Sequence, residues 1–299
     1  MPLDKNESQN LLAELKSANF ASGPVVNRGH KSRFDGVFSK EEYTRCLHEM
    51  AHLIVEIVNP HVLVRVMMNH KEVPVSTYCS EVSTAQKSYL ALDEKKLSQT
   101  VAEGATVNLN MLERLSPRFL QFSRLLETSL GCRLQTNLYY NEGSIAGFSP
   151  HYDTHDVIVC QISGEKRWQL ANCVEENVSI ATPSRPENAP KDWDTDIVLG
   201  AGDLIILPRG TWHAVTGTGE HSLHLTIGLR IPTFEDYLRW LGSHAGASPI
   251  LRTRVTAQAD FDQDTNAQIL FAGLTELSER GICFAQFLQE FNKPYSGNH

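Results

Sequence analysis

Histidine and aspartate are concentrated in one short stretch of this chain, PHYDTHDV at residues 150–157. His151 and Asp153 are two residues apart, so in an extended segment their side chains point to the same face and can hold one metal ion. A third ligand is available downstream, where PRGTWHAV turns into a predicted strand that carries His213. The three residues predict a facial triad of two histidines and one carboxylate, which leaves positions on Fe(II) open for a bidentate cosubstrate and O2. Without His213, a polar turn would be the preferred interpretation.

A second metal-binding pattern, His48-Glu49-x-x-His52, lies in a predicted helix over residues 38–57. Histidines at i and i+4 share a helical face and can bind zinc, with the glutamate as general base. Only three positions of this pattern are fixed, and the nearby Glu56 completes no metallopeptidase pattern. A zinc metallopeptidase therefore stays an alternative, and a helix with partly exposed histidines is the preferred interpretation.

Composition and charge are those of a folded, acidic chain. It has 299 residues, 41% of them hydrophobic and 21% charged, with a formal net charge of -8. The length allows one large domain, or one domain with a smaller appendage. We expect no direct nucleic acid binding because such proteins need a basic surface, and no membrane association because no apolar run is long enough to span a bilayer.

The cysteines and the first residues indicate the compartment. The six cysteines are widely scattered and form no C-x-x-C pair, which favours reduced thiols over a disulfide framework. The first residues show no apolar segment behind a basic start, so we expect no secretion signal. The prediction is a cytoplasmic protein.

Short strands separated by turns dominate the second half of the chain. Turn residues stand at the joints, among them Ser163-Gly164 and Gly217-Thr218-Gly219. Many short strands with tight turns indicate a sandwich or barrel of jelly-roll type. The predicted strands are 133–140, 156–162, 166–171, 196–199, 203–208, 213–218 and 221–230.

Helices are predicted on both sides of this region. Before it, we expect helices at 8–17, at 38–57 with Ser39 as its cap, and at 109–131, with one strand at 61–68. After Ile231-Pro232 the strands stop, and the predicted helices are 233–243, 265–280 and 281–293. We therefore expect an N-terminal helical lead-in at 1–33, a catalytic domain at 34–232 and a helical C-terminal region at 233–299.

Two segments, at 135–170 and 202–215, resemble the JmjC-type, cupin-fold Fe(II)/2-oxoglutarate oxygenases. The motifs N-x-Y, G-x-x-P-H-x-D, Q-x-x-G-x-[KR] and G-D-x-[ILV]-x-x-P-x-G-x-x-H follow one another in the family's order, and every fixed position is met. The similarity covers about residues 34–230 and is closest to the ribosomal-oxygenase branch. It implies a mainly β fold with flanking helices, a double-stranded β-helix of the jelly-roll (cupin, JmjC) type, plus a C-terminal helical region.

The resemblance also implies a binding site for 2-oxoglutarate. Lys166 matches the basic residue that pairs with the distal carboxylate of the cosubstrate, as a buried carboxylate requires. Asn137 and Tyr139 match positions that hydrogen-bond the cosubstrate, although polar residues that merely line the barrel are the alternative. Arg167 should point to the opposite face of the strand. For the metal, the family's ligands fall on the triad described above.

Three further histidines match no ligand position. His155 shares a face with His151 and Asp153 if the extended segment continues, so it can approach a substrate, although a surface or supporting role is preferred. His224 is expected to pack beside the site residues, and the role of His221 stays open.

The predicted activity is hydroxylation of a C–H bond in a protein side chain, peptide or amino-acid-derived substrate, with Fe(II), 2-oxoglutarate and O2 consumed to give succinate and CO2. The alternatives are an N-methyl demethylase of the same family and a non-catalytic cupin-like binding module. The ribosomal-oxygenase branch continues with a helical dimerisation region and a winged-helix domain. Residues 233–299 have room for the first alone, so we expect a homodimer through the C-terminal helices and leave the substrate open.

Overall fold

The computed structural model describes most of the chain and divides it into two compact units. The larger unit comprises Met1–Leu130 and Leu134–Arg230, and the smaller one Gly131–Arg133 and Ile231–His299. No helix within the described ranges is long and apolar enough to cross a membrane. The described residues are 13, 15, 23–53, 63–83, 88–172, 178–179, 184–254 and 263–292, without the side chains of 50–53 and 263–264.

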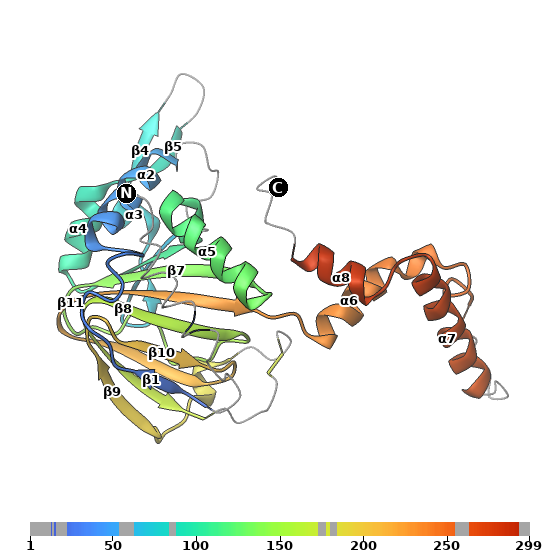
Figure 1. The fold of residues 1–299 in the computed structure, drawn as a ribbon. Helices are drawn as coiled ribbons and strands as arrows, with labels where there is room; N and C mark the ends of the chain where they lie inside the picture. Colours follow the sequence, from blue (N-terminus) through green and yellow to red (C-terminus); the bar gives the residue numbers. More distant parts are fainter. Residues whose placement is uncertain are drawn as a thin grey trace. The chain divides into compact units, whose positions relative to one another are not determined.

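An antiparallel sheet forms the framework of the larger unit (Figure 1). The strands are ordered β1-β10-β8-β11-β7-β6-β2-β3, and β9 pairs with β8 in addition. The fold is therefore the mainly antiparallel cupin fold that was predicted. The strands are β1 Val25–Asn27, β2 Val64–Met68, β3 Lys71–Glu72, β6 Thr106–Asn110, β7 Arg133–Asn141, β8 Asp156–Ala171, β9 Thr195–Leu199, β10 Leu204–Leu207 and β11 Trp212–Arg230.

Strands β8 and β11 are long, and each pairs with more than one neighbouring strand. Their ladder runs from Trp212 opposite Ala171 to Leu229 opposite Asp156, with register shifts between Gly217 and Ser222 and between Leu223 and His224. The first part of β8 pairs with β10 and its second part with β9. The predicted turns at Ser163-Gly164 and Gly217-Thr218-Gly219 were wrong as chain breaks. Ser163 and Gly164 pair with Leu223 and Ser222, Gly217 pairs with Lys166, and both strands continue through the irregularity.

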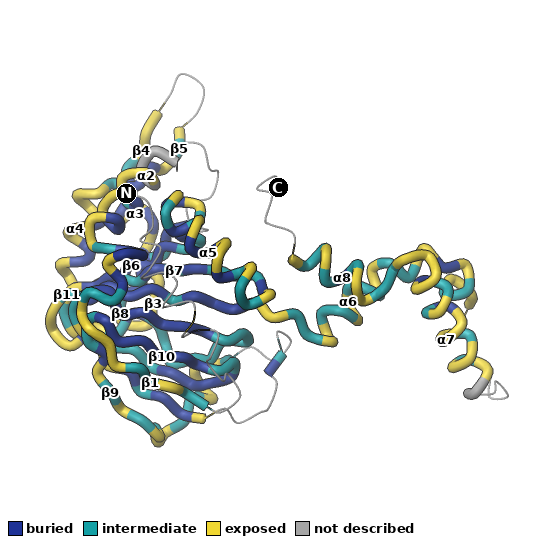
Figure 2. The backbone as a smooth tube through the Cα atoms, viewed as in Figure 1, coloured by how far each residue is buried: buried dark blue, intermediate teal, exposed yellow. Residues whose placement is uncertain are grey.

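One apolar cluster of the larger unit lies between the strands that β8 connects. Alternate side chains of each strand face inward, so the apolar residues of β8, β9 and β10 meet in one cluster. Each fully buried apolar side chain of this kind contributes roughly 1.5–3 kcal/mol. Figure 2 shows buried residues along these strands. The cluster consists of Val157, Val159, Trp168, Leu170, Leu199, Ile205 and Leu207.

Helices and a separate hairpin complete the larger unit. The predicted cap of α2 is confirmed, since the Ser39 hydroxyl accepts a hydrogen bond from the Glu42 N–H at 3.3 Å. Residues 54–57 of the predicted helix, and most of the helix predicted at 8–17, lie outside the described residues. The elements are α2 Lys40–Leu53, α3 Val75–Tyr78, β4 Cys79–Ser83, β5 Ser88–Leu92, α4 Glu94–Ala102, η2 Leu112–Arg114, α5 Pro117–Leu130 and η3 Pro186–Asn188.

The helix predicted at 109–131 was wrong in its first part. Its leucine spacing suits a helix, but residues up to Asn110 belong to β6, which is paired on both sides with β2 and β7. The helix α5 begins only at Pro117, where the Ser116 hydroxyl accepts from the Phe119 N–H at 3.1 Å. Serine followed by proline is a helix-start signal that outweighs the leucine pattern before it.

The smaller unit is helical, as predicted. Helix α6 begins with a capping box between Thr233 and Asp236. Trp240 packs against Phe287 with ring centroids 5.7 Å apart, and its indole N–H donates to Glu290 at 2.8 Å. These contacts join α6 to α8, while the dimerising role expected for this region stays a prediction. The helices are α6 Phe234–His244, η4 Ala245–Ala247, α7 Gln263–Glu279 and α8 Phe284–Phe291.

The paired irregularity of β8 and β11 can be tested at Gly164. Its φ is +64°, and a Cβ at this position would lie 1.8 Å from the His221 carbonyl oxygen. Gly164→Ala should therefore lower the free energy of unfolding by about 2 kcal/mol or more, measured by urea denaturation. Gly219→Ala is the control, because its φ is +109° but nothing lies within 4 Å of the new methyl group. Equal losses in the two variants would show that the close contact is unimportant.

Candidate metal and cosubstrate site

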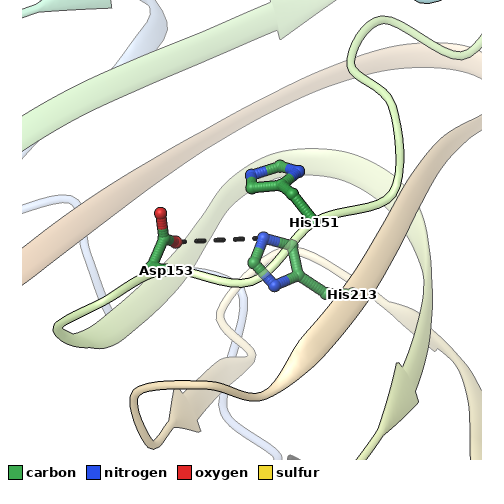
Figure 3. Close-up of side chains that lie close together, drawn as sticks. All are labelled: His151, Asp153 and His213. Carbon is green, nitrogen blue, oxygen red and sulfur yellow. Dashed lines mark ion pairs between the residues drawn. The ribbon is translucent and has the colours of Figure 1, made fainter. Parts of the chain in front are cut away.

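The three predicted metal ligands come together in the structure. One ligand atom each from His151, Asp153 and His213 lies within 4.8 Å of the other two (Figure 3). The Asp153 Oδ2 and His213 Nε2 atoms are 3.9 Å apart. Across the described ranges this is the one group of at least three histidine, cysteine or carboxylate side chains placed to hold a metal ion. Small side-chain adjustments let one ion reach all three residues.

Backbone hydrogen bonds bring these residues together from distant parts of the sequence. The His151 N–H donates to the His213 carbonyl at 3.1 Å, and the His213 N–H donates to the His151 carbonyl at 2.8 Å. The Gly210 N–H donates to the Asp153 carbonyl at 2.8 Å. The loop before β8 is therefore bonded to the turn and strand start of β11, and the ligand positions follow from backbone pairing.

Both imidazole rings are oriented by the backbone. Nδ1 of His151 lies 2.8 Å from the Ser149 carbonyl oxygen, and Nδ1 of His213 lies 3.0 Å from that of Thr211. Because a carbonyl only accepts, each Nδ1 carries the proton and each Nε2 keeps its lone pair for a metal. Burial and the neighbouring His151 lower the pKa of His213 to about 4, so this ring is neutral at pH 7. The donor set fits a divalent ion such as Fe(II).

The triad opens into a cavity inside the barrel. About 910 Å³ of empty space, including the part open to solvent, lies between the inner faces of β7, β8 and β11. Val157, Val159 and Leu207 supply apolar wall, which suits a cavity that orients a small ligand through a few polar groups. The polar lining includes Thr106, Gln135, Asn137, Lys166, His224 and Thr226.

Lys166 is a buried cation that faces this cavity. It is 3% exposed, and its Nζ donates to the Asn141 side-chain oxygen, its one hydrogen-bond partner among the described residues. Burial lowers the pKa of Lys166 to about 7. A buried ammonium without a carboxylate partner is costly, so an anionic ligand would stabilise its charged form. Arg167 faces outward as expected and pairs with Asp196 at 2.8 Å.

Tyr139 and Asn137 lie on the cavity wall, on β7. The Tyr139 ring stacks on His224, with centroids 4.9 Å apart and planes at 8°. Burial raises the pKa of Tyr139 to about 12, so its hydroxyl stays protonated at pH 7, and it hydrogen-bonds with Asn137 and Thr226. Asn137 Oδ1 is buried and has no partner among the described residues. It therefore remains available to a ligand.

Other polar atoms of the wall are also buried without a partner in the described part of the chain. They are Thr106 Oγ1, Trp168 Nε1 and His224 Nδ1. An unsatisfied buried polar atom costs about 1–3 kcal/mol, which a polar ligand could recover. Burial, together with the charge of Lys166, holds the pKa of His224 well below its usual value, so this ring is neutral.

Several of these residues were missed by sequence reasoning. Gln135, Asn137, Tyr139 and Asn141 alternate along β7, and the period of two that places Asn137 beside Tyr139 could have added the other two. Thr106 gave no such signal, because its strand was predicted in part as helix. Trp168, two residues after Lys166, could have been found by the same alternation.

The second metal pattern gains no support from the described residues. His48 is exposed on α2, and its Nδ1 lies 3.2 Å from the Glu94 carboxylate. Glu49 is exposed as well. The side chain of His52 and residue Glu56 lie outside the described part of the chain. His48 and Glu49 contribute nothing to the cavity lining.

Sequence comparison relates the chain to JmjC proteins. Residues 110–237 match the JmjC domain family. Ribosomal oxygenase 1 of Rattus norvegicus is 33% identical over 128 residues, which cover 42% of this chain and 21% of the rat protein. The bifunctional lysine-specific demethylase and histidyl-hydroxylase NO66 of Drosophila simulans is 32% identical over 132 residues, covering 43% and 16%. The chain spans only about a sixth to a third of the length of such curated relatives.

Solved structures show the same fold. The Escherichia coli ribosomal oxygenase YcfD, in complex with cobalt and 2-oxoglutarate, matches with a TM-score of 0.56 and 16% identity over 99% of this chain and 73% of that chain. At this identity the likeness concerns the fold. The JmjC match over residues 110–237, the cupin fold and the His-Asp-His triad agree with one another. The matched segment is similar in sequence to ribosomal oxygenase 1, and the fold is similar to that of a ribosomal oxygenase.

The buried charge of Lys166 predicts a pH-dependent stability. Its pKa is about 7 in the folded, ligand-free protein and 10.5 ordinarily, so folding releases a proton between these values. For this group the free energy of unfolding therefore rises from about pH 7 to pH 10. Lys166→Met should be more stable than the wild type at pH 7 and below by about 2–4 kcal/mol, and this gain should shrink towards pH 10.

Urea denaturation between pH 6 and pH 10 measures the effect. The exposed Lys95→Met is the matched control and should show no comparable gain. A Lys166→Met variant that is less stable than the wild type at pH 6 would contradict the assigned burial cost.

Proposed function

We propose that this chain is an Fe(II)- and 2-oxoglutarate-dependent hydroxylase. Its substrate would be a C–H bond of a protein side chain, peptide or amino-acid-derived molecule, and its coproducts succinate and CO2. The observation that carries the proposal is the placement, in one cavity, of the His151, Asp153 and His213 triad and a buried lysine without a carboxylate partner. Bound Fe(II) supplies the O2 chemistry that couples decarboxylation of 2-oxoglutarate to hydroxylation.

Different residues of the cavity would bind the metal and the cosubstrate. Nε2 of both triad histidines and the Asp153 carboxylate would hold the metal. Lys166 would pair with the distal carboxylate of 2-oxoglutarate, which restores the lysine charge that burial disfavours. Tyr139 and Asn137 would hydrogen-bond the same cosubstrate. The apolar wall excludes water, so that the oxidising chemistry is directed at the substrate.

The alternatives differ in what they would release or require. An N-methyl demethylase would use the same site and release formaldehyde, and the name of the NO66 relatives includes both activities. A non-catalytic cupin module would not need a triad, and here the three side chains are brought together. Hydroxylation is preferred because it needs no methylated substrate.

The proposal predicts a visible charge-transfer band when the metal-free protein is titrated anaerobically with Fe(II) and then 2-oxoglutarate. Asp153→Ala should lose the band, because it removes a metal ligand. Lys166→Met should keep iron binding but weaken 2-oxoglutarate by about 10²-fold or more, since an unpaired buried carboxylate costs several kcal/mol. Arg167→Met is the control on the outer face and should behave as the wild type. No band in folded wild-type protein would sink the oxygenase proposal.

We also propose that the C-terminal helices join two copies of the chain. Phe234 and Leu238, one turn apart on α6, are 79% and 65% exposed. Leu270 and Phe271 on α7 are exposed as well. Large apolar side chains gathered on a surface usually mark a protein interface. A homodimer through these helices would cover them.

The dimer can be tested by sedimentation of the double variant Phe234→Asp, Leu238→Asp. Two buried carboxylates would be placed at the interface, so we expect a shift from dimer to monomer at micromolar concentration. Leu125→Asp, at an exposed leucine of α5 in the larger unit, is the matched control and should leave the mass unchanged. A monomeric wild type would overturn this proposal alone.

A further inference from the structure

The cavity has two ends that can be followed along β11. His224, Thr226 and Gly228 face the cavity at intervals of two residues, opposite Gln161, Val159 and Val157 of β8. His224 lies at the end that contains Lys166. Gly228 is four residues further along, which corresponds to about 13 Å of extended strand. A five-carbon diacid held by Lys166 is shorter than this distance, so the Gly228 end stays free for another molecule.

His155 occupies this second end and is placed there by Gly228. A Cβ on Gly228 would lie 2.4 Å from His155 Nε2 and 2.6 Å from its Cδ2, so the imidazole packs directly on bare backbone. The ring lines the cavity and is mostly buried. It makes no hydrogen bond with the residues that the structure describes. A glycine that admits a histidine ring, which then hydrogen-bonds to none of the described residues, indicates a group kept for a ligand.

Gln135 supplies a second polar group at the same end. Its backbone oxygen lies 3.4 Å from the same Gly228 position, and its side chain lines the cavity. The side-chain oxygen accepts from Arg230 at 2.9 Å, which fixes the amide. The amide nitrogen then keeps its two N–H donors, for which the described residues offer no acceptor. His155 and Gln135 thus present hydrogen-bonding groups where a substrate would meet the triad.

We propose that His155 and Gln135 determine substrate specificity by binding a polar, hydrogen-bonding side chain of the substrate. This inference rests on the proposed hydroxylase function and deepens it. An aliphatic side chain would cover both groups without satisfying them, which disfavours it by at least tenfold in rate. Gly228 is the positioning residue, because any larger residue displaces the imidazole.

The experiment uses short peptide pools, each with one fixed central residue and randomised flanks. The full chain is loaded with Fe(II), 2-oxoglutarate and O2, and the gain of one oxygen is followed by mass spectrometry. We expect the pools with polar central residues to react at least tenfold faster than those with leucine, isoleucine or valine. His155→Leu should lose this preference at least tenfold while keeping the anaerobic charge-transfer band. Gly228→Ala should reproduce the loss.

The matched control is His221→Leu, a histidine of the same strand β11 that does not line the cavity. It should retain both the band and the preference. Unchanged rates in His155→Leu, or a wild-type preference for aliphatic residues, would overturn the assignment. So would a wild type that shows the band but modifies no pool. A wild type without the band overturns the hydroxylase proposal itself, and this inference with it.

Discussion

The ladder between β8 and β11 is the constraint on which the rest of the structure depends. It extends over almost the whole length of both strands and continues through two register shifts. One half of β8 pairs with β10, the other with β9, so a single strand links both sides of the barrel. His213 and Lys166 lie on this ladder, His151 is bridged to His213 beside it, and the ladder forms part of the cavity wall.

The cavity wall inside this sheet contains polar and charged groups whose burial is energetically unfavourable. Lys166 is buried with the Asn141 amide as its hydrogen-bond partner among the described residues. Several buried polar atoms of the wall have no partner among those residues. Both features reduce the stability of the protein without a bound ligand. The apolar cluster of β8, β9 and β10, which supplies part of the same wall, provides the opposing contribution. A ligand with carboxylates would pair with these groups, and the removal of their burial penalty would contribute to the binding free energy. A stable barrel can therefore hold such a site.

Much of the site was predictable from sequence because it depends on short motifs with fixed local geometry. His151 and Asp153 are two residues apart, and the turn before His213 places it at a strand start, so the triad required little knowledge of packing. What failed depended on distant contacts. Leu109, the first leucine of the helical pattern, belongs to β6, which is paired on both sides, and Ser163-Gly164 continue as strand because they pair with Leu223 and Ser222 of β11. Pairing between distant segments overrode local preference.

The position of Lys166 relative to the triad has a consequence for ligand length. Lys166 lies opposite Gly217, and His213 lies opposite Leu170, in one continuous stretch of the same ladder. Both ends of a keto diacid would therefore be held by groups whose separation is set by backbone hydrogen bonds. Under the proposed function, a shorter or longer diacid would reach only one of the two groups, and the backbone pairing of the sheet would contribute to selection by chain length.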